Sequence, residues 1–212
     1  AVADVVVTTA VLGDVRPGAI GAAERLAVVG KGPWRTTCQV HGGRVALAAS
    51  DPDGVEADAL VGAPGDGVLT MFAADCALVG IVSPEGVTGV AHCGWRGLRL
   101  GVLEALAAEM RHRGATVLAA VRSPCIGPEC YEVEESMLGE LASSLGHDVS
   151  ARTSAGRPAL DLRAGVRRAA RSAGIARLLE IDACTACDAG WFSHRARGDA
   201  RRFCLGVGAG LA

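Results

Sequence analysis

The residues with the greatest capacity for chemistry in this chain are two histidines and one cysteine. His41 precedes a glycine pair, Cys76 lies within an apolar run of strand length, and His92 ends the next such run. Zinc held by three protein ligands, with a fourth position open, is the usual catalytic arrangement. The residue types therefore favour a zinc site formed by His41, Cys76 and His92. The competing interpretation is that they are ordinary buried thiol and imidazole side chains.

The same residues allow two other chemistries. A Cys76 thiolate activated by His92 would act as the nucleophile of a cysteine hydrolase. A blue-copper centre needs a further axial ligand, often methionine. Met71 would face the opposite side of a regular strand from Cys76, which leaves Met110 and Met137 open for that role. A multicopper oxidase would need several paired histidines, and the sequence contains no His-x-His.

Arginines near these residues are candidates for binding an anion. Arg96 follows His92 where a strand passes into a helical pattern, and free helix amides and a guanidinium would both favour an anion there. Arg44, just after His41, could assist in holding phosphate. A third group near the carboxyl end is either an anion site or a solvated loop; it comprises Arg195, Arg197, Arg201 and Arg202.

Four further cysteines raise the question of a second metal site. Cys184-x-x-Cys187 has the spacing of a zinc-binding pair, whereas Cys125 and Cys130 are more widely spaced. A structural site with four thiolates and a set of reduced buried thiols are the two interpretations.

The expected elements place the candidate residues on one sheet. Two apolar runs, 73–79 and 87–92, are joined through Ser-Pro-Glu-Gly, which predicts neighbouring strands that bring Cys76 close to His92. Asp161 is a good N-cap for a helix that ends near Gly174. Further strands are expected within 5–7, 34–40, 44–47, 117–121, 178–182 and 203–207, and further helices within 22–29, 98–113 and 134–145. The pattern predicts one α+β domain, residues 1–212, with mixed β-sheets and flanking helices.

Composition narrows the class of protein. The 21 basic and 23 acidic residues give a formal charge of 21 − 23 = −2, which argues against nucleic acid as the main partner. No apolar run approaches the roughly 20 residues of a membrane helix. The segment Ala1–Asp4 lacks the features of a signal peptide, so we expect a cytoplasmic protein whose eight cysteines are mostly reduced.

Several short motifs occur together in one order. They are Gln39-Val40-His41-Gly42, Ala74-Asp75-Cys76, His92-Cys93-Gly94-Trp95-Arg96-Gly97, Pro124-Cys125-Ile126-Gly127-Pro128, Cys130-Tyr131-Glu132-Val133, Cys184-Thr185-x-Cys187 and Phe192-Ser193-x-Arg195. Together they resemble the YfiH family, also called the laccase-domain or polyphenol oxidase family. The resemblance extends from about Trp34 to Phe203.

The resemblance implies a layered sandwich and a metalloenzyme acting on small molecules. It implies that His41, Cys76 and His92 hold a metal, usually zinc, in a pocket for purine nucleosides. The implied reaction is phosphorolysis of adenosine, inosine, guanosine or methylthioadenosine, with adenosine deamination in some members. The older laccase label implies copper-dependent phenol oxidation as the alternative. The expected catalytic residues are Cys76, His41, His92 and Arg96, and the expected substrate or phosphate ligands are Arg44, Asp75, Arg96, Ser193 and Arg195.

The chain also departs from the family pattern. Cys93 stands where the family commonly has alanine, and His194 stands where it commonly has tyrosine. Thr8-Thr9 is followed by Ala10, and the chain contains no asparagine. We expect an active but divergent enzyme; a cysteine hydrolase and a non-catalytic protein that binds nucleoside or metal are the remaining alternatives.

Overall fold

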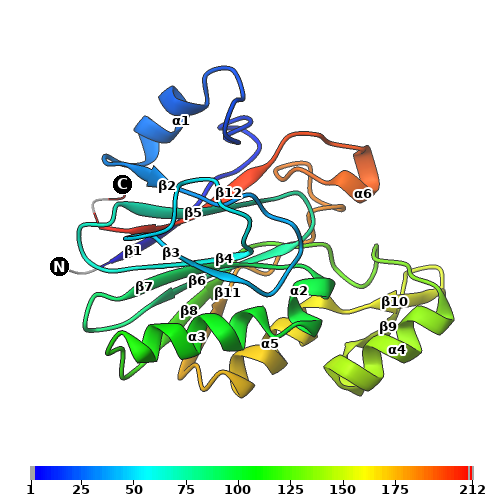
Figure 1. Ribbon diagram of the computed structural model, residues 1–212. Coiled ribbons are helices and arrows are strands. Elements are labelled where there is room, and N and C mark those ends of the chain that lie inside the picture. Colours follow the sequence, from blue (N-terminus) through cyan, green and yellow to red (C-terminus); the bar gives the residue numbers. More distant parts are fainter. Residues whose placement is uncertain (1–2, 210, 212) are drawn as a thin grey trace.

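Two β-sheets and a layer of helices stack on one another (Figure 1). The computed structural model describes residues 3–209 and 211, so residues 1, 2, 210 and 212 of the expected domain lie outside the described part. The expected α+β class with mixed sheets is confirmed, because each of the two larger sheets contains both parallel and antiparallel pairs.

The larger sheet has six strands in the order β11-β8-β6-β7-β4-β3. Its centre is the antiparallel hairpin of β6 and β7, which confirms the predicted pairing of the two apolar runs. Both central strands are almost entirely buried, as expected for strands covered on both faces. The strands span Val45–Leu47 (β3), Ala59–Gly62 (β4), Ala77–Val82 (β6), Thr88–Cys93 (β7), Ala119–Arg122 (β8) and Arg177–Glu180 (β11).

The smaller sheet has four strands in the order β1-β12-β5-β2. A short bend, residues 74–76, leads from β5 in this sheet directly to β6 in the larger one. The strands span Asp4–Val7 (β1), Trp34–Arg35 (β2), Val68–Ala73 (β5) and Phe203–Gly208 (β12), and a separate pair consists of Ser150–Arg152 (β9) and Pro158–Leu160 (β10).

Helices cover the outer face of the larger sheet, where α3 and α5 lie in Figure 1. The predicted cap of α5 is confirmed, since the Asp161 side chain accepts a hydrogen bond from the backbone N–H of Ala164. The helices span Ala22–Val29 (α1), Trp95–Arg99 (α2), Val102–His112 (α3), Glu135–Leu145 (α4), Leu162–Ser172 (α5) and His194–Arg197 (α6), with a 3₁₀ turn at His147–Val149 (η1).

Three local predictions were wrong in detail. The expected helix over 98–113 is two helices, because the chain turns through Leu100 and Gly101, whose φ is 72°. The strand expected over 34–40 has only two residues. Beyond it, the Gln39 amide satisfies the backbone N–H and carbonyl of Phe72 in place of a continued ladder. Cys76 lies in the bend before β6 and not inside a strand.

The two sheets are packed very closely. A Cβ at Gly80 of β6 would lie only 2.7 Å from Val207 and 2.8 Å from Leu205 in the facing strand β12. Small residues on the central strands therefore allow this contact, and the apolar layer between the sheets is filled by aliphatic side chains such as Leu69 and Leu78. This close packing fixes the position of the 74–76 bend relative to the end of β7.

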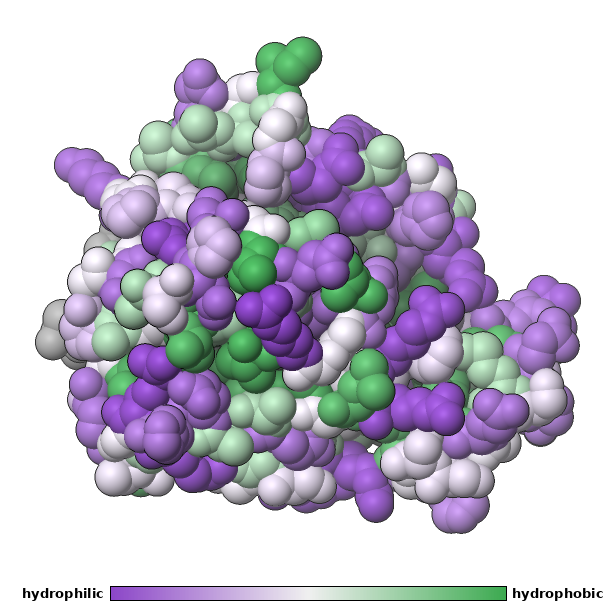
Figure 2. All heavy atoms as spheres, viewed as in Figure 1, coloured by the Kyte–Doolittle hydropathy of each residue, from purple (hydrophilic) through white to green (hydrophobic). Residues whose placement is uncertain are grey.

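The surface gives little further guidance to function. In the face shown in Figure 2, hydrophilic residues are widespread and hydrophobic residues are scattered among them. None of the helices described here is both long and apolar enough to cross a bilayer.

Candidate metal centre and substrate cavity

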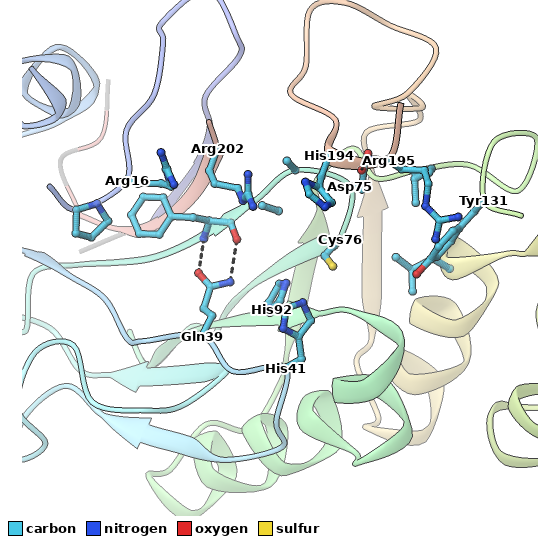
Figure 3. Close-up of a pocket in the computed structure, with 16 residues that line it drawn as sticks. Arg16, Gln39, His41, Asp75, Cys76, His92, Tyr131, His194, Arg195 and Arg202 are labelled. Atoms are coloured by element: carbon cyan, nitrogen blue, oxygen red, sulfur yellow. Dashed lines mark hydrogen bonds between the residues drawn. The ribbon is translucent and has the colours of Figure 1, made fainter. Parts of the chain in front are cut away.

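A cavity of about 550 Å³ lies where the 39–42 turn, the 74–76 bend, the loop after β8 and the segment 194–202 meet. Its volume lies within the usual range for small-molecule sites, about 300–1,000 Å³. Figure 3 shows His41, His92 and Cys76 at its floor, with arginines on either side above them. The lining residues are Arg16, Pro17, Gln39, His41, Phe72, Ala73, Ala74, Asp75, Cys76, His92, Ile126, Tyr131, Leu162, His194, Arg195 and Arg202.

His41, Cys76 and His92 come together at this floor. One potential ligand atom from each lies within 4.8 Å of those of the other two. The register of the hairpin pairs Leu78 with His92, so Cys76, two residues earlier, extends beside the end of β7. The two imidazole rings meet edge to face, with centroids 4.7 Å apart. The structure thus brings together the three residues predicted as metal ligands.

A single buried carboxylate, Asp58, holds the whole His41 turn. Its oxygens accept hydrogen bonds from the backbone N–H groups of Val40, His41 and Gly42 at 3.0, 2.9 and 2.6 Å. These bonds keep His41 in the left-handed region, at φ 60°, which is uncommon for a residue other than glycine. The same carboxylate also contacts His92 Nδ1 at 2.8 Å.

The metal-free cluster favours a thiolate and an imidazolium. Burial raises the pKa of the Cys76 thiol, but hydrogen bonds with His41 and His92 outweigh burial and lower it to about 6. Burial lowers the pKa of His92, but hydrogen bonds with Asp58 and Cys76 outweigh burial and raise it to about 9. A negatively charged sulfur therefore faces the cavity floor at neutral pH, which suits a metal cation.

These donors fit a zinc ion. Asp58 occupies His92 Nδ1 and leaves Nε2 as the ligand atom, a common outer-shell arrangement in zinc sites. Gly94 leaves space for the cluster, because a Cβ there would lie 3.1 Å from Cys76 Sγ and 3.3 Å from His41. Two imidazoles and one thiolate leave a fourth position for substrate or water.

The methionines do not supply the axial ligand of a blue-copper centre. Met71 is buried between the sheets, where its sulfur accepts a hydrogen bond from the Thr37 hydroxyl at 3.5 Å. Met110 is buried on the helical side of the larger sheet, and Met137 packs against the same cluster. None of the three lines the cavity.

Asp75 forms part of the cavity wall but its carboxylate is already occupied. Oδ1 accepts a hydrogen bond from the Thr185 hydroxyl at 2.7 Å, and Oδ2 accepts one from the backbone N–H of Arg195 at 2.7 Å. Asp75 itself adopts a positive φ of 98°. Ser193 is fully buried and caps α6 through Ala196, so it does not line the cavity. Both residues thus hold the loop that carries Arg195.

Two arginines that face each other near the top of the cavity differ in their partners. Arg16 forms an ion pair with Asp14 at 2.7 Å. Arg202 donates through Nη1 to three backbone carbonyls. No carboxylate lies within 4.0 Å of its guanidinium in the described part of the chain. Burial and the charge of Arg16 lower the pKa of Arg202. An anion beside Arg202 would relieve this uncompensated charge.

The opposite wall combines an aromatic ring and a cation. The Arg195 guanidinium lies 5.1 Å from the centroid of the Tyr131 ring and donates to the carbonyl of Glu132. Burial raises the pKa of Tyr131 to about 12, so its phenol is neutral at physiological pH. His194 lines the cavity between this wall and the arginine pair (Figure 3).

The other predicted anion ligands lie outside the cavity lining. Arg44 is largely exposed and bonds to Asp51 and to the carbonyl of Glu56. Arg96 is exposed, and its guanidinium lies 4.6 Å from the centroid of the Trp95 ring. The structure places the cations of the cavity at positions 16, 195 and 202 instead.

Several residues of the site carried no clear signal in the sequence. Asp58 is a single acidic residue before an apolar run, and Arg16 lies far from every motif. Tyr131 was visible only as part of a motif. Cys93, the unusual neighbour of His92, is buried on the helical side of the sheet, away from the cavity.

Three of the four cysteines considered as a second metal site lie together, and the fourth, Cys125, does not. Cys130, Cys184 and Cys187 lie together, with ligand atoms within 4.8 Å of one another. Cys125 is not part of this group, because its side chain is buried against the helices, where it contacts Arg122 at 3.4 Å.

Several known proteins are similar to this chain in sequence. Residues 19–209 match the family model described as multi-copper polyphenol oxidoreductase laccase. The chain is 35% identical over 189 residues to a purine nucleoside phosphorylase of Streptomyces coelicolor, which covers 84% of this chain and 78% of the relative. It is 32% identical over 190 residues to the adenosine deaminase RL5 of an unknown prokaryotic organism, which covers 81% of this chain and 70% of the relative.

Solved structures share the fold. The hypothetical protein YfiH of Bacillus licheniformis superposes with a TM-score of 0.72 and 25% identity, over 82% of this chain and 73% of that one. The Neisseria meningitidis protein NMB0706 superposes with a TM-score of 0.80 and 22% identity, over 97% of this chain and 93% of that one. The layered arrangement of sheets and helices is therefore shared with these proteins.

Proposed function

This chain belongs to the multi-copper polyphenol oxidoreductase laccase family, also known as the YfiH family, and from that membership we propose that it is a zinc-dependent purine nucleoside phosphorylase. The observation that carries the proposal is the position of His41, Cys76 and His92 at the floor of a cavity that is also lined by Arg202, which pairs with no carboxylate among the described residues. Phosphorolysis requires an anion site for phosphate and stabilisation of the departing purine, and this cavity offers arginines for the first and a metal site for the second. The similar protein from Streptomyces coelicolor is named a purine nucleoside phosphorylase.

Arg202 is the proposed phosphate ligand. Its guanidinium faces the cavity, is half-buried and has no carboxylate within 4.0 Å in the described part of the chain. Arg16 beside it is partly neutralised by Asp14, so it adds a weaker attraction. Phosphate held there would be positioned for an oxygen to attack the anomeric carbon of the ribose, while the bond from that carbon to the purine nitrogen breaks.

The departing purine takes the bonding electrons and needs stabilisation. Tyr131 remains a phenol at physiological pH and can donate a hydrogen bond from Oη to the purine. Arg195 over the face of its ring adds positive charge on the same side. Zinc bound by His41, Cys76 and His92 would supply Lewis acidity at the floor of the cavity.

Two other activities have less support from the site. Zinc deaminases use a glutamate as general acid and base. Asp75 is the only carboxylate among the lining residues described here, and both of its oxygens already accept hydrogen bonds. Phenol oxidation by several coppers would need more histidine ligands than the two at this cluster. Phosphorolysis is therefore the activity that we propose.

Product analysis tests the proposal directly. Purified protein of known zinc content is incubated with adenosine or inosine, with and without phosphate. We expect free base and ribose 1-phosphate only when phosphate is present, and loss of both after chelation or in the His41→Ala and Cys76→Ala variants. The exposed Cys38→Ser variant is the matched control for a lost thiol. Failure of the zinc-loaded protein to release any base would refute the proposal.

A further inference from the structure

A second group of thiols lies outside the catalytic cluster. Cys130 follows β8, whereas Cys184 and Cys187 follow β11, and the ligand atoms of all three lie within 4.8 Å of one another. The Sγ atoms of Cys130 and Cys187 are 3.2 Å apart. Three thiolates on a tetrahedral zinc, with Zn–S distances of about 2.3 Å, would lie about 3.8 Å apart. Only a small adjustment separates the observed group from that geometry.

The backbone around these cysteines is built to hold them. The backbone N–H of Gly127 donates to Cys184 Sγ at 3.2 Å, a type of bond that stabilises a thiolate. The strands that precede the two loops are parallel neighbours, and the main chain continues this pairing between Cys125 and Cys184. Cys184 and Cys187 then lie on one tight turn, at the spacing typical of zinc-binding pairs.

A fourth ligand is available beside the thiols. Glu129 Oε1 lies 3.9 Å from Cys187 Sγ. Two guanidinium groups offset the negative charge that such a site would collect. Arg163 lies 4.0 Å from the same carboxylate oxygen, and Arg197 donates to the carbonyls of Thr185 and Ala186 in the Cys184–Cys187 turn.

We propose that Cys130, Cys184, Cys187 and Glu129 bind a second Zn²⁺ ion, separate from the one at the cavity floor. Soft thiolates in a compact group of four donors favour zinc over magnesium, calcium or manganese. Binding releases the thiol protons to solvent and involves no change in oxidation state. All four coordination positions are filled by protein, so this ion is structural.

The second ion would link two loops that shape the substrate cavity. Tyr131 directly follows Cys130, and Thr185, which holds the Asp75 carboxylate, directly follows Cys184. Arg195, bonded through its backbone to Asp75, lies over the Tyr131 ring. Binding of zinc at the cysteine group would therefore limit the movement of the wall formed by Tyr131 and Arg195.

The test uses full-length protein whose catalytic cluster has been removed by His41→Ala and Cys76→Ser. After reduction, this protein is given Zn²⁺ alone, desalted and assayed for bound metal. We expect about one equivalent of zinc, almost none after the further change Cys187→Ser or Cys130→Ser, and weaker retention after Glu129→Gln. Cys38→Ser in the same background should retain the full amount. Cobalt in place of zinc should show strong thiolate-to-metal absorption that Cys187→Ser reduces.

Three results would overturn the proposal. These are no uptake of zinc by the reduced background protein, retention of as much zinc by the cysteine variants as by their parent, and cobalt absorption that Cys187→Ser leaves unchanged. The unaltered protein provides an independent check, because Cys187→Ser should remove one of its two zinc ions. Since the test does not use activity, its failure is distinguishable from failure of the proposed phosphorylase function.

Discussion

Asp58 Oδ1 lies 2.8 Å from His92 Nδ1 and also accepts a hydrogen bond from the backbone N–H of His41 at 2.9 Å. One buried oxygen thus orients the imidazole of His92 and the main chain of His41, which are two of the proposed metal ligands. The two histidines are 51 residues apart in the sequence, by 92 − 41. Their relative position therefore depends on a third residue that does not itself face the metal.

Replacing this carboxylate should weaken zinc binding without removing a ligand. In Asp58→Asn, the new amide cannot accept hydrogen bonds at both of its side-chain atoms, so two N–H groups lose their acceptor. We expect zinc affinity to fall about 10- to 100-fold. Each buried donor left unpaired should cost about 1–3 kcal/mol of unfolding free energy. Competition with a chelator and thermal unfolding measure the two effects. Asp66→Asn, in a surface turn, is the control, and equal zinc affinity in both variants would contradict the role of Asp58.

Zinc affinity at the catalytic cluster should depend on pH. With pKa values of about 6 for Cys76 and about 9 for His92, the metal-free cluster contains a Cys76 thiolate and a protonated His92 near neutral pH. Zinc must displace that proton, so affinity should rise about tenfold per pH unit from about 7 to 9 and then level off. Below about pH 6, Cys76 is also protonated and the dependence should become steeper.

Titration with a competing chelator in the Cys187→Ser background isolates this cluster from the second proposed site. A zinc affinity that stays constant between pH 7 and 9 would show that His92 is not protonated in the metal-free protein.

A methyl group at Gly94 should displace two of the proposed metal ligands, Cys76 and His41. Gly94 has φ −72° and ψ 165°, which alanine adopts without strain, but its Cβ would lie 3.1 Å from Cys76 Sγ. Overpacking costs about 1–3 kcal/mol, so Gly94→Ala should lower zinc affinity about 10- to 100-fold. Gly139→Ala in α4 is the matched control, because its Cβ would meet nothing within 4 Å. It should retain zinc and gain about 0.5–1 kcal/mol of stability from helix propensity.

Loss of the cation at position 202 should raise the KM for phosphate more than the KM for the nucleoside. We expect Arg202→Gln to raise the KM for phosphate about 10- to 100-fold, the effect of one charged hydrogen bond, and Arg202→Lys to recover part of it. The KM for inosine should change little. Arg201→Gln is the control, because Arg201 is exposed and pairs with Asp199 outside the cavity lining. An unchanged phosphate KM in Arg202→Gln would transfer this role to Arg16 or Arg195.

Local sequence determined the elements that carry the site. Two continuous apolar runs predicted the β6–β7 hairpin, whose register in the structure pairs Leu78 with His92. Asp161 predicted the start of α5, because a capping side chain acts within three residues of its own position. The convergence of Cys76 and His92 follows from that hairpin alone.

Only the tertiary structure decided which other residues lie near Cys76 and His92. Arg202 and Arg16 meet at the cavity because β12 pairs with β1 and β5, strands far from it in the sequence. Cys130 groups with Cys184 and Cys187 because the loop after β8 meets the turn after β11, whereas the Cys125 side chain is buried in the cluster on the helical side of the sheet. Long-range pairing leaves no periodic pattern in the chain. For this reason the metal ligands were visible in the sequence, whereas Asp58 and the choice among the arginines were not.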